Sequence, residues 1–194
     1  MANNFILVGL GELLWDMLPN GKQLGGAPAN FAYHARMLGN QGIIASRIGT
    51  DDLGKELLSR LSTLKLKTDH IQTDEIMPTG TVAVEVKEKN QPIYTITENT
   101  AWDCLEWTDP WEALAKQAKA VCFGSLAQRT TQSRVTIRRF LRAMAPGAVR
   151  IFDVNLRQFF YTTEIIHDSL LLADIVKLNE QELQQVMRVL GLKS

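Results

Sequence analysis

One short stretch of the sequence combines side chains that can exchange hydrogen bonds with a polyhydroxylated ligand. Asp16 lies shortly before the segment 25–30, which reads Gly-Gly-Ala-Pro-Ala-Asn. The two glycines allow backbone amides to approach a ligand closely, and Asn30 offers both a donor and an acceptor. A carboxylate and an amide beside a glycine turn therefore suit a ligand whose hydroxyls both donate and accept. A helix start with a purely structural glycine turn explains this segment equally well.

Two other glycine-rich segments are similar to nucleotide-binding motifs but lack a required residue. The segment 9–11 reads Gly-Leu-Gly after an expected strand, yet Leu14 occupies the position of the third glycine of a dinucleotide motif. Glu12 would also repel a pyrophosphate. The segment 49–56 has the spacing of a P-loop, but Glu56 stands where Ser or Thr should bind magnesium. We interpret both segments as turns without a phosphate site.

The segments around these residues alternate between short apolar runs and helical patterns. The apolar runs predict buried strands at 5–9, 43–48, 121–123, 150–154 and 174–178. The helical patterns predict helices at 28–38, 53–64, 111–119, 133–144, 164–172 and 180–190. Strands that alternate with helices predict a mostly parallel sheet covered on both faces.

Two regions depart from this alternation and predict a second, smaller sheet. Region 13–24 is strand-like and contains a Pro-Asn-Gly turn at 19–21, and region 81–97 has a hairpin pattern with a turn at 89–92. Alternating polar and apolar residues indicate one buried and one solvated face. We expect both regions to form a small antiparallel sheet that projects from the α/β body. The body and this sheet are expected to form one unit that comprises residues 1–194.

Composition excludes several classes of protein and partner. The chain has 194 residues, of which 45% are hydrophobic and 22% charged, as in soluble globular proteins. Its 21 basic and 21 acidic residues cancel, so it lacks the positive field of most nucleic-acid-binding proteins. No apolar run approaches the roughly 20 residues that cross a bilayer. Two separated cysteines and an N-terminus without a secretion signal favour the cytoplasm. We predict neither a nucleic-acid nor a membrane partner.

Five segments, in order along the chain, resemble signatures of the PfkB (ribokinase-like) carbohydrate kinases, and most of all those of fructokinases. They are Gly11-Glu12 with Asp16, the glycine segment 25–32 that leads to Leu38-Gly39, the Gly-x-Asp-x-x-Gly pattern within 48–54, the Asp-x-Asn-x-Arg pattern at 153–157, and the Asn-x-x-Glu pattern at 179–182. Because the five segments follow the order of the family's signatures over nearly the whole chain, the chain as a whole resembles this family.

The resemblance implies a ribokinase-like, doubly wound α/β fold whose small β-lid covers a sugar. It implies that the substrate-binding residues are Asp16, Gly25, Gly26, Asn30 and Arg157. Arg157 would also stabilise the charge of the phosphoryl group in transfer, because a guanidinium offers a fork of donors. Since the lid often serves as a dimer interface in this family, we expect a homo-oligomer formed through the lid or through the exposed edge of the sheet.

The resemblance also implies two cofactors, ATP and Mg²⁺. Asn179 and Glu182 would form the cofactor-binding pair, and Glu182 would hold the metal through water, as hard oxygen ligands do. The catalytic base of the family is an aspartate in a C-terminal Gly-Ala-Gly-Asp motif, near the adenine pocket. This sequence contains no Gly-x-Gly-Asp up to Ser194. We therefore expect no catalytic base in this chain and no activity from the chain alone.

Three functions remain open from the sequence. The first is the family activity, transfer of the ATP γ-phosphoryl group to a primary hydroxyl of a sugar, with fructose preferred. The second is a truncated, inactive chain that serves as a sugar-binding or dimerisation module. The third is phosphorylation of another sugar, a sugar acid or a nucleoside.

Overall fold

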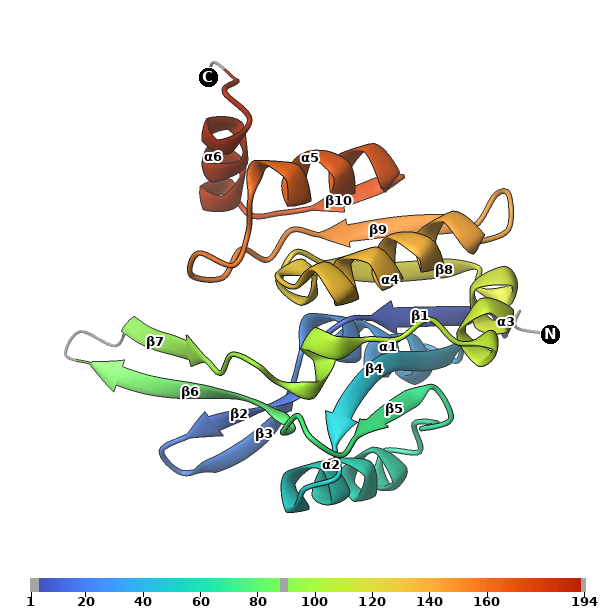
Figure 1. Cartoon of the computed structure of the whole chain (residues 1–194), viewed down its shortest axis with the longest axis vertical. Coiled ribbons are helices and arrows are strands. Elements are labelled where there is room, and N and C mark those ends of the chain that lie inside the picture. The colour runs from blue at the N-terminus through green and yellow to red at the C-terminus, as the bar shows by residue number, and fades with distance from the viewer. Residues whose placement is uncertain (1–3, 88–90, 193–194) are drawn as a thin grey trace.

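The computed structural model describes residues 4–87 and 91–192, and its larger part is a parallel sheet with helices on both faces (Figure 1). The strand order is β10-β9-β8-β1-β4-β5, and every neighbouring pair is parallel. The strands are β1 (Ile6–Leu10), β4 (Gln41–Gly49), β5 (Ile71–Asp74), β8 (Ala120–Gly124), β9 (Val149–Asp153) and β10 (Ile175–Lys177). This confirms the predicted α/β class. The sequence analysis missed β5, because this short edge strand carries mostly polar residues.

Residues 4–87 and 91–192 contain six α-helices, which cover the sheet. In Figure 1, α4 and α5 lie in front of the sheet and α1 lies behind it. The six helices are α1 (Ala27–Met37), α2 (Asp52–Thr63), α3 (Asp109–Gln117), α4 (Thr131–Ala143), α5 (Thr163–Leu172) and α6 (Glu180–Val189). All six were predicted to within two residues at each end. Side-chain caps mark the start of several of these helices. The Asp51 side chain accepts a hydrogen bond from the Gly54 amide at 2.8 Å, and Asn179 caps α6 in the same way.

The second sheet is the lid, and it projects from one side of the body (Figure 1). Its strands are β2 (Leu14–Leu18), β3 (Gly21–Gly25), β6 (Gly80–Lys87) and β7 (Gln91–Ile96), in the order β3-β2-β6-β7. Both hairpins are antiparallel, but β2 and β6 pair in parallel. The lid is therefore mixed, and the prediction of an antiparallel sheet was wrong on this point. Leu14 pairs with Gly80 because both hairpins leave the body at the same place and run outward together.

The predicted turn at 89–92 falls partly outside the described residues, since positions 88–90 are among those left out. On either side of them, Lys87 pairs with Gln91 and the register continues to Val82 opposite Ile96. The apolar side chains of Val82 and Ile96 are buried at the base of the lid. Val82 and Ile96 thus form a buried cross-strand pair, of the kind that the alternating pattern predicted for this hairpin.

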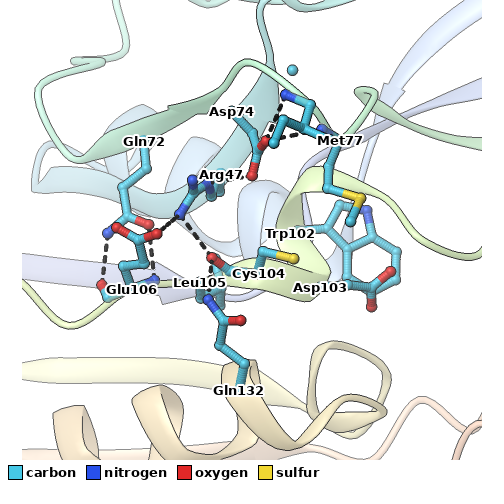
Figure 2. Close-up of polar contacts among 12 residues, drawn as sticks. Arg47, Gln72, Asp74, Met77, Trp102, Asp103, Cys104, Leu105, Glu106 and Gln132 are labelled. Carbon is cyan, nitrogen blue, oxygen red and sulfur yellow. Dashed lines mark hydrogen bonds and ion pairs between the residues drawn. The ribbon is translucent and has the colours of Figure 1, made fainter.

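Arg47 on β4 holds together three segments near the base of the lid (Figure 2). Its Nε lies 2.9 Å from Asp74 Oδ2 at the end of β5, and one terminal nitrogen lies 2.6 Å from Glu106 Oε1. The same nitrogen donates to the Cys104 carbonyl at 2.9 Å. Cys104 ends η1 (Ala101–Cys104), the short helix that follows the lid. Arg47 thus ties the returning chain to the sheet edge.

A second arginine fixes the point where the lid ends. Arg129, just after the short helix η2 (Leu126–Gln128), donates to both oxygens of Asp103, at 2.7 and 2.6 Å, and to the Thr97 carbonyl at 2.7 Å. Its guanidinium carbon lies 4.0 Å from the ring centroid of Trp102. The bidentate contact sets the position of Arg129 relative to Asp103. Both side chains are almost fully buried, so separating them would leave a buried charge without a partner.

The edge strand β10 pairs only with β9 in the part of the chain that the structure describes. Its Ile175 and Val176 side chains are exposed. An exposed apolar edge strand is a template for pairing with another chain, so oligomerisation through this edge or through the lid stays a prediction. None of the described helices is both long and apolar enough to span a bilayer.

Gly26 joins the lid to α1 and has a backbone that disfavours other residues, with φ at 105°. A Cβ at this position would collide with the carbonyl oxygen of Glu12. We expect Gly26→Ala to lower the free energy of unfolding by about 2 kcal/mol, because φ strain and the collision add. Gly39→Ala is the matched control, since Gly39 also has a positive φ but open space around its Cβ.

The control should lose only about 1 kcal/mol, which is the cost of φ strain alone. Urea denaturation of the parent and both variants measures the two losses. Equal losses in the two variants would show that the Glu12 carbonyl does not constrain position 26.

Candidate functional site

A cavity of about 580 Å³ lies between the lid and the carboxyl ends of the body strands. In open α/β sheets this edge is where ligands bind. Its wall combines apolar side chains of the lid with a ring of polar ones. The polar lining residues are Glu12, Asp16, Asn30, His34, Asp153, Asn155, Arg157 and Lys177. Asp16, Gly26, Asn30 and Arg157, which the sequence analysis selected, all lie on this cavity.

A second cavity, of about 620 Å³, lies between the lid, α1 and α2. Asn30 borders it as well, and two of its charged side chains, Lys22 and Glu56, form an ion pair at 2.5 Å. Asp16 and Arg157 are not part of its wall. The chemistry expected from the sequence therefore gathers in the smaller cavity.

Asp16 reaches the cavity from the middle of β2. Its side chain is half-buried, and this burial raises the pKa of its carboxyl, while the positive charge of Arg157 acts in the opposite direction. Gly25, on the neighbouring strand, makes room for it, because a Cβ at Gly25 would collide with the Asp16 carboxylate. Gly25 is not among the lining residues, so the structure gives it a spatial role beside Asp16.

Asn30 and Gly26 border the cavity from the start of α1. The Asn30 amide donates to the Gly26 carbonyl at 2.9 Å, which closes the first turn of the helix. The Asn30 side chain is exposed and can use both its donor and its acceptor. Asp16, Gly26 and Asn30 therefore share one wall, although the lid hairpin separates them in sequence.

Arg157 enters from the loop after β9. Two residues of this loop, Asn155 and Gln158, have left-handed backbones with φ at 39° and 47°, a conformation that costs energy outside glycine. The guanidinium carbon of Arg157 lies 5.6 Å from the ring centroid of Tyr94 on β7. Because Tyr94 belongs to the lid, this contact brings body and lid together over the cavity.

The sequence analysis missed the pair formed by Asp153 and Lys177. Asp153 ends β9 and Lys177 ends β10, and the lysine Nζ lies 2.9 and 3.1 Å from the two carboxylate oxygens. The signal was present, since Asp153 opens the Asp-x-Asn-x-Arg pattern. Only the parallel pairing of β9 with β10, however, places Lys177 opposite it. Tyr94 was missed for a similar reason, because its side chain reaches the site only through lid packing.

Asn179 and Glu182 lie at the start of α6 and do not line the cavity. Asn179 Oδ1 accepts from the Glu182 amide, and Glu182 Oε2 accepts from the Asn179 amide, both at 2.9 Å. Glu182 Oε1 accepts from the Leu156 amide at 3.0 Å, so this carboxylate also holds the loop that carries Arg157.

Asn179 Oδ1 and the two carboxylate oxygens of Glu182 each accept one backbone hydrogen bond and keep a second lone pair. The pair can therefore accept hydrogen bonds from metal-bound water, which fits a water-mediated Mg²⁺ contact. Within residues 4–87 and 91–192, no three or more His, Cys, Asp or Glu side chains are grouped so as to hold an ion directly. The magnesium role of Glu182 stays a prediction.

Glu12 is a further residue of the cavity that the sequence analysis did not assign to the site. It lies in the connection between β1 and β2 with only 2% of its surface exposed. Its Oε1 accepts from the Ala27 amide at 3.3 Å, and its Oε2 has no protein donor in the described structure. Burial raises the pKa of this carboxyl to about 7, against the lowering effect of the backbone hydrogen bonds.

The raised pKa of Glu12 predicts that the protein loses stability as pH rises. Between the ordinary value of 4.5 and about 7, the unfolded chain releases the Glu12 proton while the folded chain keeps it. The free energy of unfolding should therefore fall over this window, by about 3 kcal/mol in total. Glu12→Gln should lack this fall, because glutamine does not titrate.

The measurement is urea denaturation at pH 5, 6, 7 and 8, compared between the parent and the glutamine variant. The difference between the two proteins removes the contribution of all other groups, Asp16 included. Parallel curves for the two proteins would contradict a raised pKa at Glu12.

The chain matches the pfkB family carbohydrate kinases over residues 17–193. The sugar kinase PH1459 of Pyrococcus horikoshii is 30% identical over 91% of this chain and 62% of that protein. Its structure in complex with ATP has a TM-score of 0.81 and 30% identity, with 97% of this chain and 67% of that one covered. A fructokinase of Escherichia coli is 29% identical over 89% of this chain and 60% of its own length.

The fructokinase of Vibrio cholerae, solved with fructose, ADP and calcium ion bound, has a TM-score of 0.79. It is 22% identical, over 98% of this chain and 64% of that one, and so supports the fold alone. The chain thus spans less than two thirds of the length of the curated relatives named here. The family match nevertheless includes most of its residues. This chain belongs to the pfkB family of carbohydrate kinases.

Proposed function

We propose that the cavity binds an unphosphorylated sugar, with fructose preferred, for ATP-dependent phosphorylation of a primary hydroxyl. The observation that carries this proposal is the convergence of Asp16, Asn30 and Arg157 on one cavity beneath the lid. A half-buried carboxylate accepts hydrogen bonds from hydroxyls, and an amide can both donate and accept. The fructokinase of Escherichia coli, at 29% identity, supports fructose as the sugar.

The charges of the cavity also favour a neutral ligand. Lys177 is already paired with Asp153, and Asp16 lies close enough to Arg157 for the two charges to interact. A sugar phosphate would need several unpaired cations, whereas the described part of the cavity offers Arg157 alone without an ion pair.

Arg157 would serve the transfer step by stabilising negative charge as the phosphoryl group moves to the sugar. Positioning of the sugar by the lid and by Asp16 would supply most of the remaining rate enhancement. When bound, Mg²⁺ neutralises phosphate charge, and Glu182 with Asn179 would contact it through water. A sugar acid is the alternative substrate class, because its carboxylate could pair with the same guanidinium of Arg157.

We further propose that this chain alone does not phosphorylate sugar, because it contains no Gly-x-Gly-Asp segment that could supply the base and its anion hole. It would then act as a sugar-binding or dimerisation module. A coupled assay with fructose, ATP and Mg²⁺ should show no turnover above the protein-free blank. Turnover at ordinary kinase rates that disappears in Asp16→Ala would contradict this.

Sugar binding by the chain tests the site residues directly. We expect Asp16→Ala to weaken fructose affinity at least tenfold, because a lost charge-assisted hydrogen bond costs about 1.5–3 kcal/mol. Asn30→Ala should weaken it several-fold through loss of one neutral hydrogen bond or two. Isothermal titration calorimetry measures both. The melting temperature should change little, since neither side chain packs in the core.

Asp52→Ala is the control for these variants. Asp52 has an almost fully exposed side chain at the start of α2, away from the cavity, and pairs only with Lys55. It should bind fructose as the parent does. If Asp16→Ala and Asn30→Ala instead lower the melting temperature and leave the affinity unchanged, the glycine turn is purely structural and the proposed site is wrong.

A further inference from the structure

Glu12 combines deep burial with an oxygen that no protein group satisfies. Its Oε1 accepts from the Ala27 amide at the start of α1, while its Oε2 meets no hydrogen-bond donor among the described residues. The residue is part of the wall of the 580 Å³ cavity, together with Asp16 and Asn30. Buried polar atoms are rarely left without a partner in native proteins, because desolvation then goes uncompensated.

We propose that Glu12 is a further sugar-binding residue, whose Oε2 exchanges a hydrogen bond with a substrate hydroxyl in this cavity. This inference rests on the proposed sugar-binding function and adds a third hydrogen-bonding side chain to Asp16 and Asn30. It also selects a substrate class, since the ligand must present a hydroxyl, and not a methylene or a hydrogen atom, to Oε2.

The chemistry of the two oxygens determines how Glu12 can bind. Because Oε1 is occupied by an N–H donor, the proton of the neutral acid resides on Oε2. Neutral Glu12 therefore donates to the ligand, and ionised Glu12 accepts from it. A ligand hydroxyl can accept a hydrogen bond from neutral Glu12 and donate one to ionised Glu12. The pKa of about 7 means that both states are populated near neutrality. Ionisation should strengthen binding, because a charged acceptor makes the stronger hydrogen bond.

Several other groups around the cavity carry charge or titrate. They are Asp16 on β2, His34 on α1, Cys122 on β8, Asp153 on β9, Arg157 after β9 and Lys177 on β10. Burial raises the pKa of the Cys122 thiol to about 12, so it stays neutral. A histidine, His34, also lines the cavity. A test of Glu12 must therefore separate its effect from that of His34.

Glu12→Gln is the decisive variant, because it keeps the size of the side chain. Its amide oxygen can accept from the Ala27 amide, which leaves the NH₂ group in the place of Oε2 as a permanent donor. The variant thus mimics neutral Glu12 at every pH. Calorimetric titration with fructose at pH 6 and pH 8 should show that the parent gains affinity several-fold with rising pH, while the variant does not.

At pH 8 the variant should bind fructose about tenfold more weakly than the parent. Glu112→Gln is the matched control, since Glu112 lies on α3 outside the cavity and pairs with Lys116 on the same helix; it should behave as the parent. His34→Gln should retain the pH dependence. If Glu12→Gln keeps the affinity and pH dependence of the parent while Asp16→Ala loses affinity, the inference fails and the proposed function stands.

A measurement on the parent alone covers the case in which the variant does not fold. The side-chain carboxyl carbon of Glu12 can be followed by ¹³C NMR during a pH titration. Saturating fructose should lower its midpoint, because binding favours the ionised form; an unmoved midpoint overturns the inference. A parent chain that binds no fructose at either pH overturns both this inference and the proposed function, an outcome different from failure of the variant test alone.

Discussion

The contact between the Gly25-Gly26 turn and the chain around Glu12 determines where the walls of the cavity lie. Each glycine lies against a group that would collide with a Cβ, Gly25 against the Asp16 carboxylate and Gly26 against the Glu12 carbonyl. The Ala27 amide then donates to the Glu12 side chain. Because this one turn joins the lid to α1, its close packing sets the distance between the carboxylate of β2 and the amide of Asn30.

Two arginines hold the segments at the base of the lid against the body. Arg129 binds Asp103 and the Thr97 carbonyl where the lid ends, and Arg47 binds the segment that follows. Buried ion pairs contribute little net stability after desolvation, but breaking one is costly. Their effect here is geometric, because they fix the base of the lid. The contact of Tyr94 with Arg157 then places β7, an outer strand of the lid, above the cavity.

The electrostatics of the cavity follow from the meeting of strand ends. Parallel strands bring the last residues of β9 and β10 together, which pairs Asp153 with Lys177. Glu182 performs a related task from α6, since it accepts from the Leu156 amide and holds the loop that carries Arg157. Arg157 is thus positioned by a carboxylate outside the cavity, which links the Asn-x-x-Glu pattern to the wall of the cavity.

Local patterns in the sequence determined the helices, most of the strands, the α/β class and the glycine turn with Asp16 and Asn30. This was feasible because helix caps such as Asp51 and Asn179 are encoded within a few residues. The tertiary structure alone decided the parallel pairing of β2 with β6, the Asp153–Lys177 pair and the burial of Glu12. These depend on contacts between segments distant in sequence, where the order of strands sets which side chains meet and how much water they keep.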